Sequence, residues 1–170
     1  MKDLFNNLPA CEAVSTRVIT VSPTTRLDEV ARLFEEHDIN AAPVVDGFGK
    51  CVGVITSHDL VEYEAHRIQT ENECKHGIAF NMARYGDGDS QGLVGQPYDE
   101  VACHMSHNFH EISGQNLMSE AGRIMCQNHV HHLVMLDSAG RPIGILSSLD
   151  IIGRILGEPV ARIDRSKPMK

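Results

Sequence analysis

Two short segments of this chain carry hydroxyl and carboxyl groups at the same spacing. They are Gly53–Asp59 and Gly144–Asp150, and each contains a glycine, two apolar residues, a hydroxyl, two further residues and an aspartate. One interpretation is helix capping, because Asp, Ser and Thr satisfy the free N–H groups at a helix start. The other is ligand binding, because a helix N-terminus with a hydroxyl suits phosphate and a carboxylate can accept the hydroxyls of a ribose.

The two segments belong to an internal repeat. A shift of 91 positions aligns Ser15–Asp59 with Ser106–Asp150 without a gap, and nine aligned positions are identical. Ordinary composition would give about three identities over such a length. The apolar pattern repeats as well, so the chain contains two copies of one unit.

The spacing of apolar residues predicts the same order of elements in each copy: strand, helix, strand, strand, helix. In the first copy we expect a strand at Arg17–Val21, a turn with a hydroxyl N-cap at Ser22–Thr25, a helix with Leu27, Val30, Ala31 and Phe34 on its apolar face, strands at Ala41–Asp46 and Cys51–Ile55, and a helix from near Leu60. In the second copy we expect strands at Asn108–Ile112, Leu133–Leu136 and Ile143–Leu146, a helix carrying Met118, Ala121, Gly122 and Met125, and a helix from about Ile151.

One such unit cannot cover both faces of its small sheet. We therefore predict an α/β (α+β) fold in which two tandem βαββα units pack sheet to sheet about a pseudo-twofold axis. The expected boundaries are 1–62 for the first unit with its N-terminal segment, 63–103 for a helical and Gly/Asp-rich linker, 104–156 for the second unit and 157–170 for a polar tail. In the linker, Asp87–Gly92 begins like a calcium-binding loop, but Tyr98 stands where a bidentate Glu is required, so we expect no calcium there.

Composition narrows the function. The chain has 170 residues and a formal net charge of −8, which disfavours nucleic-acid binding. Its five cysteines have no CxxC spacing, and it has no apolar run of membrane-spanning length, so we expect reduced, mostly buried thiols in a cytoplasmic protein that does not enter a membrane. It lacks GxSxG, HExxH and Walker motifs, and we do not expect an enzyme.

Both copies resemble CBS domains, and the whole chain resembles a CBS pair, or Bateman module. The resemblance is carried by Ile39–Asp46 with Gly53–Asp59 and by Val130–Asp137 with Gly144–Asp150. The second copy is also similar to a nucleotide-binding repeat in the gamma subunit of AMP-activated protein kinase. The resemblance implies a regulatory module that binds AMP, ADP, ATP or S-adenosylmethionine between its units, needs no other cofactor and forms a homodimer, with an enzyme or transporter as a further partner.

The resemblance also implies two pseudo-equivalent clefts. In the favoured one, Asp150 takes the ribose, the phosphate lies near Ser147, and the remaining residues are His131 and His132 near the phosphate and Val14, Arg17, Ile19, Ile39 and Asn40 around the adenine. In the other, Asp59 takes the ribose, Thr56 and His58 lie near the phosphate, and the base is lined by Met105, Asn108, His110, Val130 and His131. His110 stands where the family has an apolar residue, which disfavours the Asp59 cleft.

Two alternatives stay open. The module could be a structural dimerisation scaffold that binds no ligand. It could also be a metal-responsive regulator, because imidazole is a common ligand for zinc, nickel and copper. The histidines concerned are His104, His107, His110, His129, His131 and His132. Ordinary surface or phosphate-facing histidines are the preferred interpretation, so no metal site is predicted.

Overall fold

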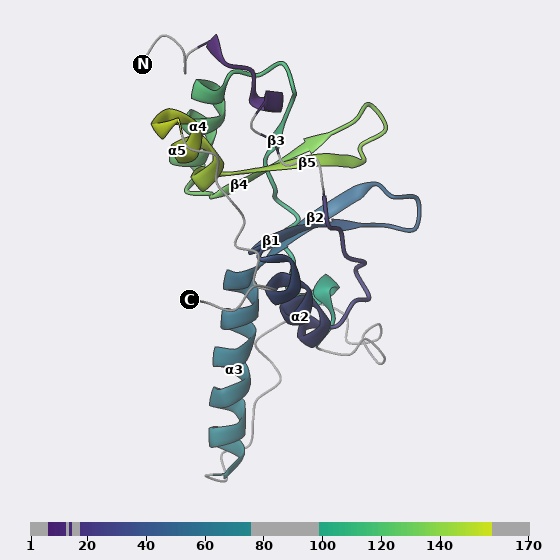
Figure 1. Cartoon of the computed structure of the whole chain (residues 1–170). Coiled ribbons are helices and arrows are strands. Elements are labelled where there is room, and N and C mark those ends of the chain that lie inside the picture. Colours follow the sequence, from purple (N-terminus) through teal and green to yellow (C-terminus); the bar gives the residue numbers. More distant parts are fainter. Residues whose placement is uncertain (1–6, 13, 15–17, 76–98, 158–170) are drawn as a thin grey trace.

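The computed structural model describes residues 7–12, 14, 18–75 and 99–157. Two units lie one above the other with their sheets facing (Figure 1). The first contains α2 (Leu27–His37), β1 (Ala41–Val45), β2 (Cys51–Thr56) and α3 (Ser57–Lys75). The second contains β3 (Glu111–Ile112), α4 (Met118–Asn128), β4 (His132–Leu136), β5 (Pro142–Ser147) and α5 (Ser148–Leu156). The predicted mixed fold of two repeated units is confirmed.

The hairpins of the two units follow the 91-residue offset closely. β1 pairs antiparallel with β2 and β4 with β5, and the register shifts between Val44 and Val45 in one hairpin and between Met135 and Leu136 in the other. Gly49 and Gly140 close the two turns with φ of 79° and 77°, a backbone conformation that glycine adopts without steric cost. The repeated sequence therefore produces a repeated backbone, including its irregularities.

The first predicted strand of each unit is shorter than expected. In the second unit only Glu111–Ile112 of the predicted Asn108–Ile112 forms a strand, which pairs parallel with β4. In the first unit Val18–Thr20 has no strand pairing and Val21 makes a single parallel bridge to Val44, while residues 15–17 lie outside the described part. The prediction of a strand at Arg17–Val21 is thus wrong for its described residues apart from Val21.

Helix α2 packs through its predicted apolar face, with two corrections. Leu27, Val30 and Phe34 are buried, but Ala31 is exposed. The expected hydroxyl cap is also wrong, because the N-cap is Arg26 and its side chain makes no capping bond. The hydroxyls of the preceding turn bond within that turn instead, since the Thr24 and Ser22 hydroxyl oxygens are 3.0 Å apart and the Thr25 Oγ1 accepts from the Ser22 N–H.

The last helix of each unit begins three residues earlier than predicted. α3 begins at Ser57 rather than near Leu60, and α5 begins at Ser148 rather than at Ile151. The reason is the aspartate at the third helical position, which accepts backbone and hydroxyl bonds from the residue just before the helix and so fixes the first turn.

A short segment at the start of each repeat packs into the opposite unit. Ala10, in the 3-10 turn Ala10–Glu12, is fully buried in the core of the second unit with Leu133 and Leu146. Val101, in the equivalent turn Val101–Cys103, is buried in the core of the first unit with Ile55. Each segment is also bonded there, the Ala10 N–H to the Asn116 carbonyl and the Val101 N–H to the Thr25 carbonyl. The two units are therefore interlocked through exchanged segments.

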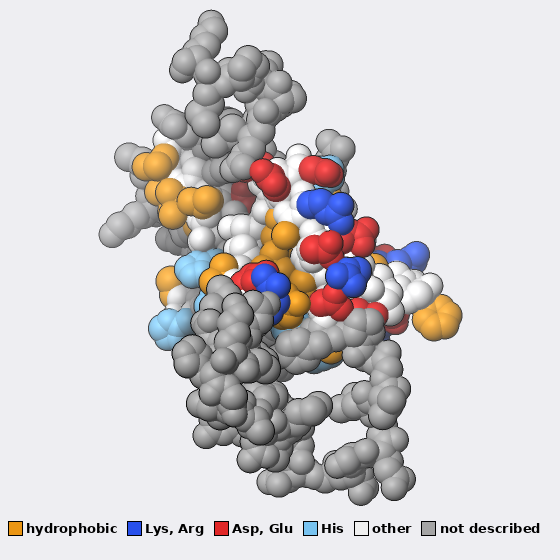
Figure 2. Space-filling model, turned by 90° about the horizontal axis from the view of Figure 1, so that it is seen from below, with side chains coloured by type: hydrophobic (Ala, Val, Ile, Leu, Met, Phe, Trp, Pro, Cys, Tyr) orange, Lys and Arg blue, Asp and Glu red, His pale blue; other side chains and the backbone are white. Residues whose placement is uncertain are grey.

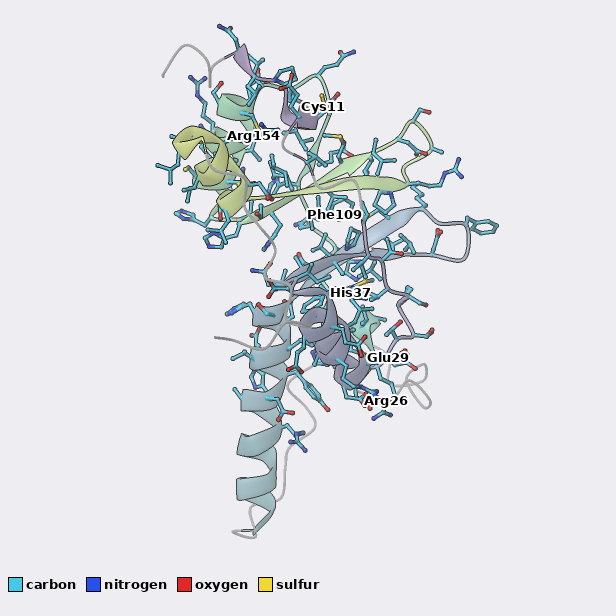
Figure 3. The ribbon with its side chains drawn as sticks, in the orientation of Figure 1. Cys11, Arg26, Glu29, His37, Phe109 and Arg154 are labelled. Atoms are coloured by element: carbon cyan, nitrogen blue, oxygen red, sulfur yellow. The ribbon has the colours of Figure 1, made fainter. Side chains whose placement is uncertain are left out.

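A third apolar cluster lies between the two sheets. Ala41, Cys51 and Val54 of the first sheet meet Val134 of the second, with Phe109 packed against them. Figure 3 shows Phe109 in the space between the sheets. Gly53 also matters at this junction, because a Cβ there would lie 2.9 Å from both the Met105 sulfur and the Ser106 carbonyl oxygen.

The remaining predictions about single residues have mixed outcomes. Cys51 is buried, but Cys11, Cys103 and Cys126 are exposed, so the expectation of mostly buried thiols is wrong for the described cysteines. The loop Arg84–Gly92 with its calcium-like segment lies outside the described residues. Among the helices that the structure describes, none is both long and apolar enough to cross a membrane.

Candidate functional site

A cleft of about 700 Å³ lies where the two units meet. The first turns of α3 and α5 enter it from the two units, and the segments before β3 and β4 complete it. Its lining residues are Asn40, Val54, Thr56, Ser57, His58, Asp59, Ser106, Asn108, Phe109, His110, His129, Val130, His131, His132, Ser147, Ser148 and Leu149. Hydroxyls and imidazoles dominate this list, and among these lining residues Asp59 is the one carboxylate and there is no Lys or Arg.

Asp59 holds the start of α3 and faces the cleft. Its Oδ2 accepts hydrogen bonds from the Thr56 N–H and the Thr56 hydroxyl, both at 2.7 Å. Both of these bonds use one carboxylate oxygen, so Oδ1 is the atom that a ligand hydroxyl in the cleft could reach. Asp59 can therefore cap the helix and accept a ligand hydroxyl at the same time.

Asp150 plays the matching part at α5. Its Oδ2 accepts from the Ser147 N–H at 2.8 Å and from the Ser147 hydroxyl at 2.5 Å, and the Asp150 N–H donates to Ser147 Oγ at 3.2 Å. This is a reciprocal capping box. Ser147 lines the cleft, but Asp150 is not among the lining residues.

His132 connects the two units at the edge of the cleft. Its Nε2 lies 2.9 Å from Asn40 Oδ1, across the boundary between the units. Burial lowers the pKa of His132, nearby His131 lowers it further, and Asp150 opposes both. His132 is thus held neutral near pH 7, where its ring N–H donates to the Asn40 carbonyl oxygen. Its first role in the fold is to join the units.

The other histidines divide between the cleft and the surface. His58, His110, His129 and His131 line the cleft, whereas the His104 ring packs edge to face against Tyr63 with centroids 5.0 Å apart. Figure 2 shows histidine side chains gathered at one edge of the lower face, while most Lys and Arg on that face are interspersed with Asp and Glu elsewhere. Within the described residues, no three His, Cys, Asp or Glu side chains are grouped so that they could hold a metal.

The cleft brings together residues from both predicted sites. It contains Asp59, Thr56 and His58 with Asn108, His110, Val130 and His131, which are the residues predicted for the Asp59 cleft apart from Met105. It also contains four residues assigned to the Asp150 cleft, Asn40, His132, Ser147 and His131, the last of which was assigned to both clefts.

Val14, Ile19 and Ile39, also assigned to the Asp150 cleft, are not among the lining residues of this cavity. Val14 packs over Gly144 and against the second core, and Ile39 packs against the first core. Ile19 is half-buried, and Arg17 lies outside the described residues.

Several lining residues were not predicted from the sequence. Ser57 and Ser148 are the first helical residues after the two hydroxyl caps, and the repeat that revealed Thr56 and Ser147 contained them as identical positions. Phe109 had no comparable signal, because its position depends on how the two sheets face each other. Ser106, His129 and Leu149 were likewise assigned no role in the site.

Comparisons with known proteins identify a matching family model, a relative in sequence and two solved structures of similar fold. The family model for the CBS domain matches residues 10–66 and 99–157. The protein MJ1232 of Methanocaldococcus jannaschii is 30% identical over 83% of this chain, which spans 37% of that protein's length. The solved CBS domain pair of protein MJ0100, in complex with 5′-methylthioadenosine and S-adenosyl-L-methionine, is similar with a TM-score of 0.65 and 22% identity, over 88% of this chain and 99% of that one. The structure of CBSX2 in complex with AMP gives a TM-score of 0.65 and 19% identity, over 88% of this chain and 97% of that one.

Proposed function

Because the chain belongs to the CBS domain family and carries the domain as a tandem pair, we propose that it is a regulatory module that binds an adenosyl ligand in the cleft between its units. The observation that carries the proposal is the convergence of two aspartate-stabilised helix starts, at Thr56–Asp59 and Ser147–Asp150, on one cavity of about 700 Å³. Pockets for small molecules and cofactors commonly measure roughly 300–1,000 Å³, so the cleft has room for one nucleoside ligand.

We place the ribose at Asp59. The Oδ1 of this carboxylate accepts a ribose hydroxyl while Oδ2 keeps its two bonds to Thr56. The phosphate or other 5′ substituent then lies at the starts of α3 and α5, where the hydroxyls of Ser57 and Ser148 and the helix dipoles stabilise negative charge. The base lies toward Asn108, His110 and Val130.

This placement reverses the preference drawn from the sequence. His110 disfavoured the Asp59 cleft because an apolar residue is usual there, yet His110 is one of the half-buried residues that line the cavity. An imidazole ring can pack on a base with its face and bond with its nitrogens, so it is compatible with an adenine site. The Asp150 side remains a prediction for a second, weaker site.

The ligands of similar structures support the adenosyl class. The domain pair of MJ0100 was solved with 5′-methylthioadenosine and S-adenosyl-L-methionine, and CBSX2 was solved with AMP. In the proposal, the ligand binds one relative arrangement of the two units more tightly than another and so increases the population of that arrangement. A partner enzyme or transporter in the cytoplasm responds to that change. The module itself catalyses no reaction and needs no other cofactor.

We also propose that two copies associate through the outer faces of α3 and α5. Leu149, Ile152 and Leu156 are 57%, 49% and 70% exposed on one side of α5, and Val61 of α3, the repeat equivalent of Ile152, is 66% exposed. Apolar side chains grouped in this way are typical of an interface. This surface also keeps the scaffold hypothesis open, in which dimerisation occurs without any ligand.

Thermal unfolding with and without ligands tests the proposed function. The probes are AMP, ADP, ATP, S-adenosylmethionine and 5′-methylthioadenosine, with GMP as the control for the base and zinc as the probe for the metal hypothesis. A ligand at a hundred times its dissociation constant adds about 2.7 kcal/mol to the free energy of unfolding. We expect at least one adenosyl ligand to raise the melting temperature and GMP to have a much smaller effect. No response to any adenosyl ligand at millimolar concentration would leave the scaffold hypothesis, and a response to zinc alone would favour the metal hypothesis.

A further inference from the structure

Imidazoles are the most numerous ionisable side chains among the described residues that line the cleft. Five histidines line it, His58, His110, His129, His131 and His132, together with the carboxylate of Asp59. Among the described lining residues there is no Lys or Arg to provide a permanent positive charge. A phosphate in this cleft would therefore meet imidazoles, hydroxyls and helix starts.

Two of the imidazoles lie beside the helix starts. His58 is in the first turn of α3, and its side chain is exposed to the cleft. The His131 carbonyl accepts the N–H of Ser148, the first residue of α5, and its side chain is also exposed. Each unit thus contributes one cleft-lining imidazole beside the start of its last helix, where the helix dipole favours an anion.

The other ionisable groups that line the cleft come from several elements. α3 contributes Asp59, the segment before β3 contributes His110, the end of α4 contributes His129, and β4 contributes His132. His132 is hydrogen-bonded to Asn40, and the charge of Asp150 in α5 acts to raise the pKa of His132 against the larger lowering by burial. With neutral imidazoles, the charge on the described lining residues is that of the Asp59 carboxylate, which opposes a phosphate dianion.

We propose that binding of a phosphate-bearing adenosyl ligand is coupled to the uptake of a proton by His58 and His131, so that the cleft responds to pH as well as to nucleotide. The inference rests on the proposed function. A bound phosphate favours the charged imidazolium over the neutral ring, and the ligand therefore binds more tightly as the pH falls. A phosphate monoester has its second pKa near about 6, so AMP is mostly dianionic above neutral pH and only the protein titrates further.

A neutral ligand with the same nucleoside isolates this effect. 5′-Methylthioadenosine carries no phosphate, so its affinity has no reason to follow the protonation of His58 and His131. AMP affinity is expected to fall severalfold between pH 6.5 and pH 8.5, because an imidazolium that stabilises the bound phosphate is lost as the pH rises. The ratio of the two affinities measures proton coupling without interference from general changes in the fold.

Isothermal titration calorimetry at pH 6.5, 7.5 and 8.5 tests the proposal, with AMP and 5′-methylthioadenosine as probes and two phosphate-free buffers of different ionisation enthalpy. We expect AMP to take up protons near pH 7 and the neutral probe to take up none. In the double variant H58Q/H131Q, AMP should bind with little pH dependence, and the affinity for 5′-methylthioadenosine should stay independent of pH even if the loss of two lining side chains changes its value. H37Q, at an exposed histidine on the last turn of α2 and outside the cleft, is the matched control and should behave like the unchanged chain.

The outcomes separate the inference from the proposed function. If 5′-methylthioadenosine and AMP both bind but AMP affinity does not depend on pH, the inference is overturned and the proposed function stands. The same holds if the pH dependence survives in H58Q/H131Q. If neither probe binds at any pH, both are overturned. If the dependence is present, specific to AMP and lost in the double variant, the inference is supported.

Discussion

The two halves of the cleft share a backbone and differ in the side chains placed on it. At the starts of both α3 and α5 the aspartate Oδ2 accepts two bonds, from Thr56 and from Ser147, and α5 has in addition the bond from the Asp150 N–H to Ser147 Oγ. Yet His58 of the first unit has Leu149 as its equivalent in the second. One half therefore faces the cleft with an imidazole and the other with an exposed apolar side chain.

The difference indicates that the two copies share the residues that determine the fold, while exposed positions such as 58 and 149 differ and serve different functions. The caps are needed twice because both helices must start at the edge of a sheet. A polar residue at position 58 serves the cleft, while Leu149 is continuous with the exposed apolar residues Ile152 and Leu156 of α5. In our account the Asp59 half binds the ligand and the outer face of α5 contributes more to association between copies.

The largest expected effect tests whether the two units are independent. Ile55→Ala and Leu146→Ala remove equivalent side chains, each with 0% exposure, from the cores of the first and second unit. Each is expected to lower the free energy of unfolding by about 2–5 kcal/mol. Because residues 10 and 101 are exchanged between the cores, unfolding should remain one transition in both variants, as followed by calorimetry and circular dichroism. Two separate transitions, with only the altered unit shifted, would show independent units.

A smaller effect concerns the first helix of each unit. Ala31 of α2 is exposed, and its equivalent in α4 is Gly122, where an added Cβ would meet no atom within 4 Å. Gly122→Ala should raise the free energy of unfolding by about 0.5–1 kcal/mol, and Ala31→Gly should lower it by a similar amount, because glycine is the weaker helix former. Urea unfolding measures both. A loss of stability in Gly122→Ala would mean that the position carries a contact that this account lacks.

The smallest expected effect is the pH dependence caused by His132. Its pKa in the folded chain is lowered, so the unfolded chain binds the proton more readily. The stability that its neutral form contributes is present above the unfolded pKa of about 6.5 and is lost as the pH falls through the lower folded value. His132→Gln keeps a donor for Asn40 Oδ1 and should show a flatter loss of stability on acidification, measured by urea unfolding from pH 7.5 to 5. An equally steep loss would assign the acid sensitivity to other groups.

The sequence predicted those features that depend on local spacing. The offset of 91 gave the hairpins, their turns at Gly49 and Gly140, and the caps at Asp59 and Asp150, and the structure contains each of them. From the sequence, helix capping and ligand binding are two separate interpretations of these aspartates. The geometry makes them compatible, because the cap occupies one carboxylate oxygen and leaves the other.

The features that the sequence did not predict depend on contacts between distant segments. Nothing local in residues 8–14 or 99–105 indicates that each packs on the opposite unit. Val18–Val21 consists of β-branched residues, which favour a strand, but only Val21 pairs with a neighbouring strand residue, Val44. Strand propensity alone therefore did not determine the structure of this segment. His132 was predicted near phosphate, and only the fold shows that it bonds to Asn40 across the boundary between the units.

The central claim is that ligand binding depends on Asp59, and a matched pair of variants tests it most directly. Asp59→Asn and Asp150→Asn each keep a side-chain oxygen that can accept the N–H and hydroxyl bonds of Thr56 or Ser147, so both should unfold at nearly the temperature of the unchanged chain. The measurement is the dissociation constant of 5′-methylthioadenosine for each variant by calorimetry at pH 7.5. We predict a loss of about ten- to a hundredfold for Asp59→Asn, since a hydrogen bond to a charged group contributes about 1.5–3 kcal/mol, and little change for Asp150→Asn. The reverse pattern, with binding lost in Asp150→Asn and retained in Asp59→Asn, would contradict the account.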